Sequence, residues 1–260
     1  MKININADVG ESFGRYKIGN DEELVPLIGS ASIACGMHAG DPAVMARTID
    51  IALRHGTSIG AHPGFDDRWG FGRRRIDMRP DDLEHLVAYQ IGALQGIAAG
   101  RGAKVTHVKP HGALNNMAIQ DHEYALAIGR GIRAADASLV YVANFGSAMY
   151  HAAQELGLKV AREFYADRNY DDDGNIISRT FAQAMITDPG LAAEHVVRAV
   201  TEGNVVSVTG KLVEVAVDSI CIHGDEPTAV AVAVAVRRAL QDAGYEIVPL
   251  PNLALSSKPH

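Results

Sequence analysis

The sequence predicts an α/β fold, an irregular TIM-like (β/α) barrel of seven or eight strands. Strand-like and helix-like segments alternate along its 260 residues, which indicates parallel strands joined by helices. The length is close to that of one such barrel, so we expect one catalytic domain over residues 1–260. Short hydrophobic runs are also followed at once by polar, reactive residues, as happens where barrel strands end. These segments lie at 3–11, 33–42, 59–64, 105–114 and 220–225.

The first half of the chain contains four predicted strands, at Ile3–Asp8, Ala31–Cys35, Thr57–Ala61 and Lys104–Lys109. Helices are predicted between them, near Asp21–Ile28, over 42–55 and near Asp81–Ala99. Asp41 is predicted to cap the second helix and Pro42 to occupy its first position. Residues 63–80 are predicted to form a long polar loop rich in Gly, Arg and Asp.

The second half continues the pattern, with predicted strands at Leu139–Ala143, Lys159–Phe164, Ser219–His223 and, closing the fold, Tyr245–Pro249. The expected helices lie near His122–Ala135, Ala148–Leu156, Gly190–Glu202 and Pro227–Ala243. Residues 167–180 are rich in turn-forming residues, and residues 205–217 resemble a β-hairpin.

Polar side chains recur on one face of several predicted strands. The two-residue period of a strand places Asn4, Asn6 and Asp8 on one side of the first strand. His107 and Lys109 share a face of the fourth. An ordinary barrel interior is filled by Val, Ile and Leu, and burying unpaired polar groups costs several kcal/mol. We therefore expect the upper interior of the barrel to be the active site.

Composition excludes several classes of function. The net charge of −7 argues against nucleic acid or an anionic membrane as the main partner. The first residues contain no apolar run typical of a secretory signal, and we expect a cytoplasmic protein. Its only cysteines, Cys35 and Cys221, would then stay reduced. A homo-oligomer is compatible with the sequence.

Four histidines, His38, His62, His111 and His223, each follow a hydrophobic run. Such residues serve as bases, as donors to an anion or as metal ligands, although a lone one more often bonds a backbone carbonyl. No HExxH spacing or cysteine pair accompanies them, so the metal signal is weak. A divalent ion held by Asp8 together with His38, His62 or His111 remains open.

Charged residues complete the candidate site. Asp8 and Glu11 form a carboxylate pair at the end of the first strand. Lys109 occupies an inner position, where it would stabilise an oxyanion or pair with Asp8 or Glu163. The DRWGFGRRR segment offers arginines for a carboxylate or phosphate, and its Trp69 and Phe71 suggest a lid or a partner surface. The sequence contains no P-loop, no GxSxG elbow and no GxGxxG after a strand.

These segments resemble the LamB/YcsF family in order and over nearly the whole chain. The resemblance rests on DVGE at Asp8–Glu11, CGMHAGDP at Cys35–Pro42, GAHPG at Gly60–Gly64, GFGRR at Gly70–Arg74, VKPHGAL at Val108–Leu114 and SICIHGD at Ser219–Asp225. It implies ATP-dependent hydrolysis of 5-oxo-L-proline to L-glutamate, with Mg²⁺, and two separate partner chains, the B and C subunits of a 5-oxoprolinase. It also implies a barrel akin to glycoside hydrolases and deacetylases.

The resemblance also suggests roles for the candidate residues. Asp8 would orient or deprotonate the nucleophile, with Glu11 beside it, while Lys109 and His111 stabilise the activated oxygen. The remaining candidates would bind substrate: His38, His62, Arg68, Arg73, Arg74, Asn144, Glu163, His223 and Asp225. Two other functions stay open. One is a metal-dependent deacetylase or amidohydrolase that needs no ATP, and the other is a non-catalytic subunit that only binds the lactam.

Overall fold

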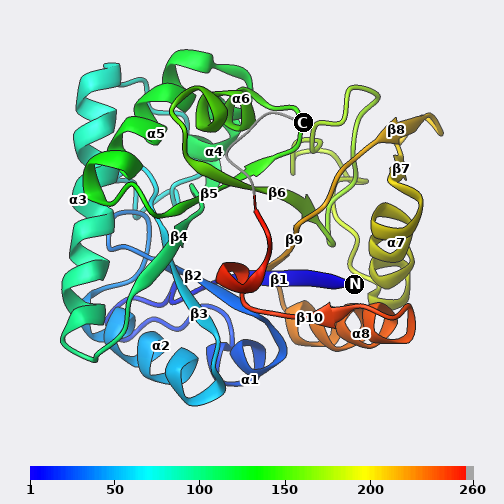
Figure 1. Cartoon of the computed structure of the whole chain (residues 1–260), viewed down its shortest axis with the longest axis horizontal. Helices are drawn as coiled ribbons and strands as arrows, with labels where there is room; N and C mark the ends of the chain where they lie inside the picture. The colour runs from blue at the N-terminus through cyan, green and yellow to red at the C-terminus, as the bar shows by residue number, and fades with distance from the viewer. Residues whose placement is uncertain (256–260) are drawn as a thin grey trace.

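A computed structural model describes residues 1–255 and contains the predicted barrel (Figure 1). Seven parallel strands close into a ring, because β1 pairs with β2 on one side and with β9 on the other. In ring order they are β1 (Lys2–Val9), β2 (Ser30–Ala34), β3 (Ser58–His62), β4 (Val105–Val108), β5 (Val140–Asn144), β6 (Lys159–Tyr165) and β9 (Ser219–His223). A short eighth strand, β10 (Glu246–Ile247), pairs only with the start of β1. The expected fold class is therefore confirmed.

Helices cover the outside of the ring (Figure 1). They are α1 (Asp21–Leu24), α2 (Pro42–His55), α3 (Pro80–Ala99), α4 (Gly112–Gln120), α5 (His122–Ala135), α6 (Ala148–Glu155), α7 (Pro189–Glu202) and α8 (Ala229–Asp242). The predicted cap of α2 is confirmed, since the Asp41 carboxylate accepts the backbone N–H groups of Ala43 and Val44. None of the described helices is long and apolar enough to cross a membrane.

Three elements differ from expectation. The helix expected over Asp21–Ile28 changes at Val25 into a 3₁₀ turn, η1 (Val25–Leu27), which contains Pro26. Helix α4 was not predicted, because its segment GALNNMAIQ begins with a glycine and holds two asparagines, all weak helix formers. The closing strand is shorter than expected, because η2 (Leu250–Asn252) follows it and turns under the barrel.

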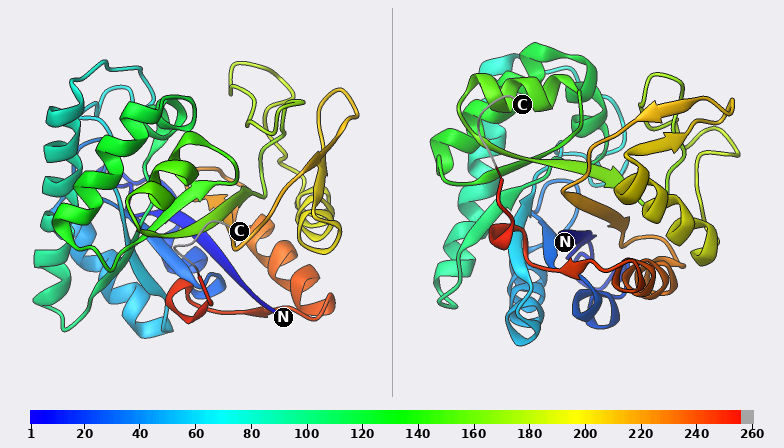
Figure 2. Two further views of the ribbon diagram at one scale, coloured as in Figure 1. Left: turned by 45° about the horizontal axis from the view of Figure 1, so that its top comes forward. Right: turned by 45° about the vertical axis from the view of Figure 1, so that its right-hand side comes forward.

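A second small sheet lies beside the barrel. Strands β7 (Asn204–Val206) and β8 (Leu212–Glu214) form the expected antiparallel hairpin. Together with α7 and the long connection from β6, this hairpin stands out on one side of the ring (Figure 2). The connection from β6 returns over the barrel mouth and contributes Asn175–Thr180 to the wall of the main cavity.

The lower barrel interior is polar and internally hydrogen-bonded. Asn4 donates to the Ser30 hydroxyl at 2.8 Å and accepts from Ser219 at 2.6 Å, while Asn6 donates to Glu163 at 3.0 Å. Asn4, Asn6 and Asp8 are all buried, as the alternation along β1 predicted. Because these groups satisfy one another, the interior tolerates them without large desolvation costs.

Candidate active site

The main cavity opens at the carboxyl ends of the strands, where the sequence placed the site. It has a volume of about 600 Å³, within the range of roughly 300–1,000 Å³ that is usual for small-molecule sites. The predicted residues on its wall are Asp8, His62, Arg73, Lys109, His111 and His223. Residues that sequence reasoning did not select also line it, among them Asn115, Tyr165, Arg168 and Arg179.

Lys109 lies at the floor of this cavity and is 2% exposed. Its Nζ is 2.7 Å from Asp8 Oδ1 and 3.2 Å from Glu163 Oε1, so it pairs with both carboxylates that the sequence proposed as its partners. Nζ also donates to Cys221 Sγ at 2.7 Å. The floor of the cavity is therefore a fixed array of charges rather than an apolar surface.

Opposite charges keep this array ionised. Burial is the largest influence on the pKa of Asp8 and raises it, but attraction to His62 and Lys109 outweighs burial, so the pKa lies below its usual range. Burial likewise lowers the pKa of Lys109, while Asp8, Cys221 and Glu163 together raise it well above its usual value. Asp8 is thus an ionised carboxylate that can hold a water molecule, and Lys109 a permanent cation.

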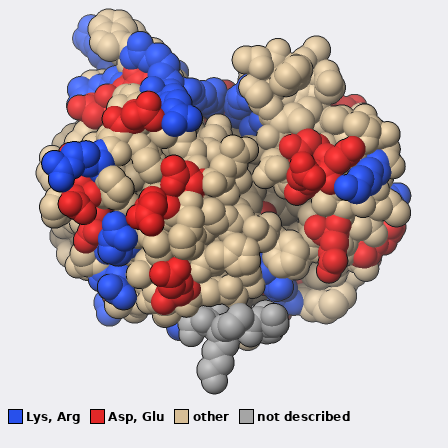
Figure 3. All heavy atoms as spheres, turned by 90° about the horizontal axis from the view of Figure 1, so that it is seen from above, with Lys and Arg blue, Asp and Glu red and all other residues tan. Residues whose placement is uncertain are grey.

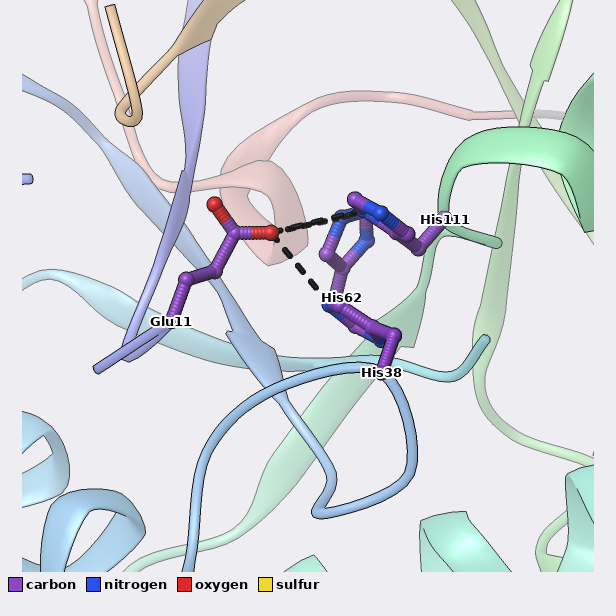
Figure 4. A group of neighbouring side chains, drawn as sticks. All are labelled: Glu11, His38, His62 and His111. Carbon is purple, nitrogen blue, oxygen red and sulfur yellow. Dashed lines mark hydrogen bonds and ion pairs between the residues drawn. The ribbon is translucent and has the colours of Figure 1, made fainter. Parts of the chain in front are cut away.

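A second group of side chains lies beside this floor: Glu11, His38, His62 and His111 (Figure 4). We call it the Glu-His cluster. Glu11 Oε1 is 3.3 Å from His38 Nε2, 3.4 Å from His111 Nδ1 and 4.0 Å from His62 Nε2. The rings of His38 and His111 stack at 3.7 Å, and that of His62 stands edge-on to both. The loops after β1 and β2 and the ends of β3 and β4 bring these residues together.

The electrostatics of the Glu-His cluster reflect its burial. Burial raises the pKa of Glu11 to about 8 and lowers the pKa of both His38 and His111 to about 3. The one ligand atom that each residue offers lies within 4.8 Å of the others, so the cluster is a candidate metal site. Three of the four predicted candidates belong to it. Asp8 lies outside the cluster, although its Oδ2 is 3.5 Å from His62 Nε2. Glu11 instead takes the position that was expected for Asp8.

Two further residues of the cavity wall, His223 and Arg73, are each held by a carboxylate. His223 Nδ1 lies 2.9 Å from Asp167 Oδ1, which orients the ring beside Asp8. Arg73 Nη2 is 2.6 Å from Asp225 Oδ2. Asp225 thus positions Arg73, and its expected role in substrate binding stays a prediction.

Six predicted substrate-binding residues lie outside this cavity wall: His38, Glu163 and Asp225, whose contacts are given above, and Arg68, Arg74 and Asn144. Arg68 is exposed and donates to the Gly36 carbonyl, and Arg74 pairs with Asp67. Asn144 lines a separate cavity of about 250 Å³. Within residues 67–75, which we call the arginine loop, the ion pair with Asp67 holds Arg74, whose side chain is largely exposed.

Arg168 is the most informative residue that sequence reasoning missed. It is 5% exposed, lines the main cavity and donates to the Ile177 carbonyl. Its Nε has no hydrogen-bond partner among residues 1–255. Burial and the neighbouring Arg179 both lower its pKa. A buried guanidinium in this state is suited to bind an anion, and the FYADR segment at the end of β6 was the available signal.

The arginine loop is basic although the chain has a net charge of −7. Basic side chains gather in one part of the face seen in Figure 3, although acidic ones are more numerous overall. Trp69, between exposed arginines, is itself 97% exposed. The suggestion that this loop is a lid or partner surface stays a prediction.

Comparison with known proteins agrees with the motifs. The A subunit of 5-oxoprolinase from Clostridium beijerinckii is 48% identical over 252 residues, 97% of this chain and 99% of that protein. The corresponding protein from Thermococcus onnurineus is 46% identical, covering 96% and 98% respectively. The crystal structure of a lactam utilization protein from Thermus thermophilus matches at 42% identity with a TM-score of 0.91, covering 95% of this chain and 99% of that one. Because the LamB/YcsF family model also matches residues 3–255, the chain belongs to the LamB/YcsF family.

Proposed function

We propose that this chain is the A component of a 5-oxoprolinase, acting in the cytoplasm on 5-oxo-L-proline with ATP and Mg²⁺. One observation carries the proposal: a buried cation, Lys109, forms the floor of a cavity whose wall holds a second buried cation, Arg168. The proposed substrate has a lactam carbonyl and a carboxylate, and both are bound by such groups. The names of the relatives, which refer to 5-oxoprolinase and to lactam utilization, support the same substrate.

The chemistry explains why ATP would be needed. A five-membered lactam is a stable amide and a poor electrophile. Transfer of the terminal phosphoryl group of ATP to the lactam oxygen would release ADP and give a reactive imidate phosphate. Water then adds to the carbon, the ring C–N bond breaks, and a further water releases phosphate to leave L-glutamate.

We assign the roles as follows. The Lys109 ammonium, aided by His111, stabilises the charge on the lactam oxygen. Asp8 stays ionised beside Lys109 and orients the attacking water. Arg168, rather than Arg68 or Arg74, binds the substrate carboxylate, because it alone of the three is buried on the cavity wall. Arg73 and His223 complete the pocket.

Partner chains are part of the proposal. The relatives are named as one lettered component of 5-oxoprolinase, which supports an assembly with further chains, and we take these to be the B and C subunits. The sequence of this chain holds no P-loop, so a phosphate-binding loop of that kind would have to come from a partner. The cavity of about 600 Å³ has room for a lactam and a phosphoryl group that a partner delivers.

A second function is favoured by the Glu-His cluster. Three histidines and a glutamate suit a metal that activates water, which would support an amidohydrolase or deacetylase independent of ATP. The two functions differ in whether phosphate release accompanies amide cleavage.

The deciding experiment mixes the purified chain with 5-oxoproline and Mg-ATP, with and without the B and C subunits, and measures glutamate and phosphate together. Equal release of both, only with the partners present, is the expected result. ATP-independent cleavage of another amide, without any coupled release, would replace this function with the second one.

A further inference from the structure

Two histidine nitrogens in the Glu-His cluster face each other without a proton between them. His62 Nδ1 is 2.7 Å from the Lys109 carbonyl, and His111 Nε2 is 2.8 Å from the Phe71 carbonyl. A carbonyl only accepts, so both of these nitrogens carry hydrogen. In neutral rings the remaining nitrogens, His62 Nε2 and His111 Nδ1, bear lone pairs, and they lie 2.9 Å apart.

Facing lone pairs repel each other unless a positive charge lies between them. A proton would bridge only one pair of atoms, whereas two more donors lie close by: Glu11 Oε1 is 3.4 Å from His111 Nδ1 and 3.3 Å from His38 Nε2 (Figure 4). A metal cation accepts electron pairs from all four donors at once. The same two carbonyl contacts are the support that metal-binding histidines usually have, with the outer N–H held by a backbone oxygen.

The distances agree with a four-coordinate ion. A tetrahedral site with Zn–N bonds of roughly 2.0–2.1 Å places neighbouring ligand atoms about 3.3 Å apart. Four of the six separations between ligand atoms in the Glu-His cluster are 2.9, 3.3, 3.4 and 4.0 Å, and all the ligand atoms lie within 4.8 Å of one another. Binding one ion requires the side chains to rotate, including a tilt of the His38 and His111 rings, which stack in parallel.

We propose that Glu11, His38, His62 and His111 bind one divalent transition-metal ion of the zinc class. Imidazole nitrogen suits such ions, whereas Mg²⁺ and Ca²⁺ prefer all-oxygen ligands, so this ion is distinct from the Mg²⁺ that accompanies ATP. It would join the loops after β1 and β2 with the ends of β3 and β4 and stabilise the rim of the cavity. Metal binding itself does not depend on the proposed function, but any part of the ion in hydrolysis rests on it.

The test uses the full chain, stripped of metal with a chelator and dialysed. Zn²⁺ and Co²⁺ are titrated while binding, melting temperature and the visible Co²⁺ spectrum are measured. We expect one ion per chain, a higher melting temperature and Co²⁺ bands typical of four ligands including nitrogen. Glu11→Gln and His62→Ala should each weaken binding at least about 10-fold. His85→Ala, on an exposed face of α3, serves as the matched control and should bind normally.

A wild-type chain that takes up neither ion, or binding that survives both cluster substitutions, would overturn the proposal. If either variant fails to fold, the titration of the metal-free wild-type chain still decides. Coupled glutamate and phosphate release with the partner subunits is measured on the same samples. Absent metal with intact coupling would refute only the metal site, and bound metal without coupling would refute only the proposed function.

Discussion

Lys109 Nζ lies 2.7 Å from Asp8 Oδ1 at the centre of the barrel, with Glu163 Oε1 3.2 Å away. All three side chains are buried. Burial opposes the charge on each, but their mutual attraction lowers the pKa of Asp8 and raises that of Lys109. One cation is thus paired with two carboxylates. Removing the cation and removing one carboxylate should therefore have different effects.

Replacing the cation should harm both stability and function. In Lys109→Met, Asp8 and Glu163 would face each other in the interior without a counter-charge. We expect the free energy of unfolding to fall by about 3–5 kcal/mol, measured by urea denaturation, with loss of coupled turnover. Arg54→Met, which removes the exposed pair with Glu22, should cost less than about 1 kcal/mol. Equal effects of the two substitutions would contradict this account.

Neutralising Asp8 should separate function from folding. In Asp8→Asn, Glu163 still neutralises Lys109, so we expect a folded chain with an unchanged circular dichroism spectrum. Loss of the carboxylate that orients water should lower coupled turnover at least about 100-fold. Turnover close to that of the wild type would show that Asp8 has no part in the reaction.

Substrate affinity should depend on Arg168. Arg168→Lys keeps the charge but loses the two-pronged geometry that suits a carboxylate, so we expect KM for 5-oxoproline to rise about 10- to 100-fold. The KM for ATP should change little. Arg68→Lys, in the exposed loop, is the matched control and should leave both values near normal.

A lactam without a carboxylate tests whether Arg168 acts on that group. The lactam 2-pyrrolidinone has no carboxylate, so any turnover of it should be equally slow in the wild type and in Arg168→Lys. If Arg168→Lys slows both lactams by the same factor, the residue acts on something other than the substrate carboxylate.

The pH dependence of stability should reveal the anchor of the arginine loop. The hydrogen bond from Arg74 lowers the pKa of Asp67 to about 2 from the usual 3.8. The unfolded state then binds more protons between these values, so this contribution is complete above about pH 4 and disappears as the pH falls through about 2. The stability difference between the wild type and Asp67→Asn should therefore shrink from about pH 5 to about pH 2. A constant difference over that range would exclude the ionised pair as its cause.

Much of the fold and part of the site could be predicted because strand periodicity is local information. Asn4, Asn6 and Asp8 alternate with apolar residues, and that pattern alone placed them inside a barrel. The partners of Lys109 followed, because parallel strands bring their carboxyl ends to one rim.

The remaining features depend on geometry between segments. Glu11 follows β1 by only a short stretch, where the chain turns at Gly10 with φ of 67°. Asp8 is close to His62 alone of the three histidines in the cluster, whereas Glu11 lies near all three. Arg74 and Arg168 are equally basic in sequence. Arg74 pairs with Asp67, whereas Arg168 is buried where the loop after β6 folds back to the cavity. Neither outcome can be inferred from spacing alone.

A final prediction concerns the close packing beneath the site. A Cβ atom at Gly60 on β3 would overlap Nε2 of the buried His107 ring, so Gly60→Ala must displace that ring. We expect a loss of about 1–3 kcal/mol in the free energy of unfolding. At Gly92, exposed on α3, nothing lies within 4 Å of such an atom, so Gly92→Ala should instead stabilise by about 0.5–1 kcal/mol. The same chemical change is made at both sites, so urea denaturation can compare them directly. A lower free energy of unfolding for Gly60→Ala with a higher one for Gly92→Ala would attribute the loss to contact with His107. Equal stabilisation at the two positions would show that the ring moves freely.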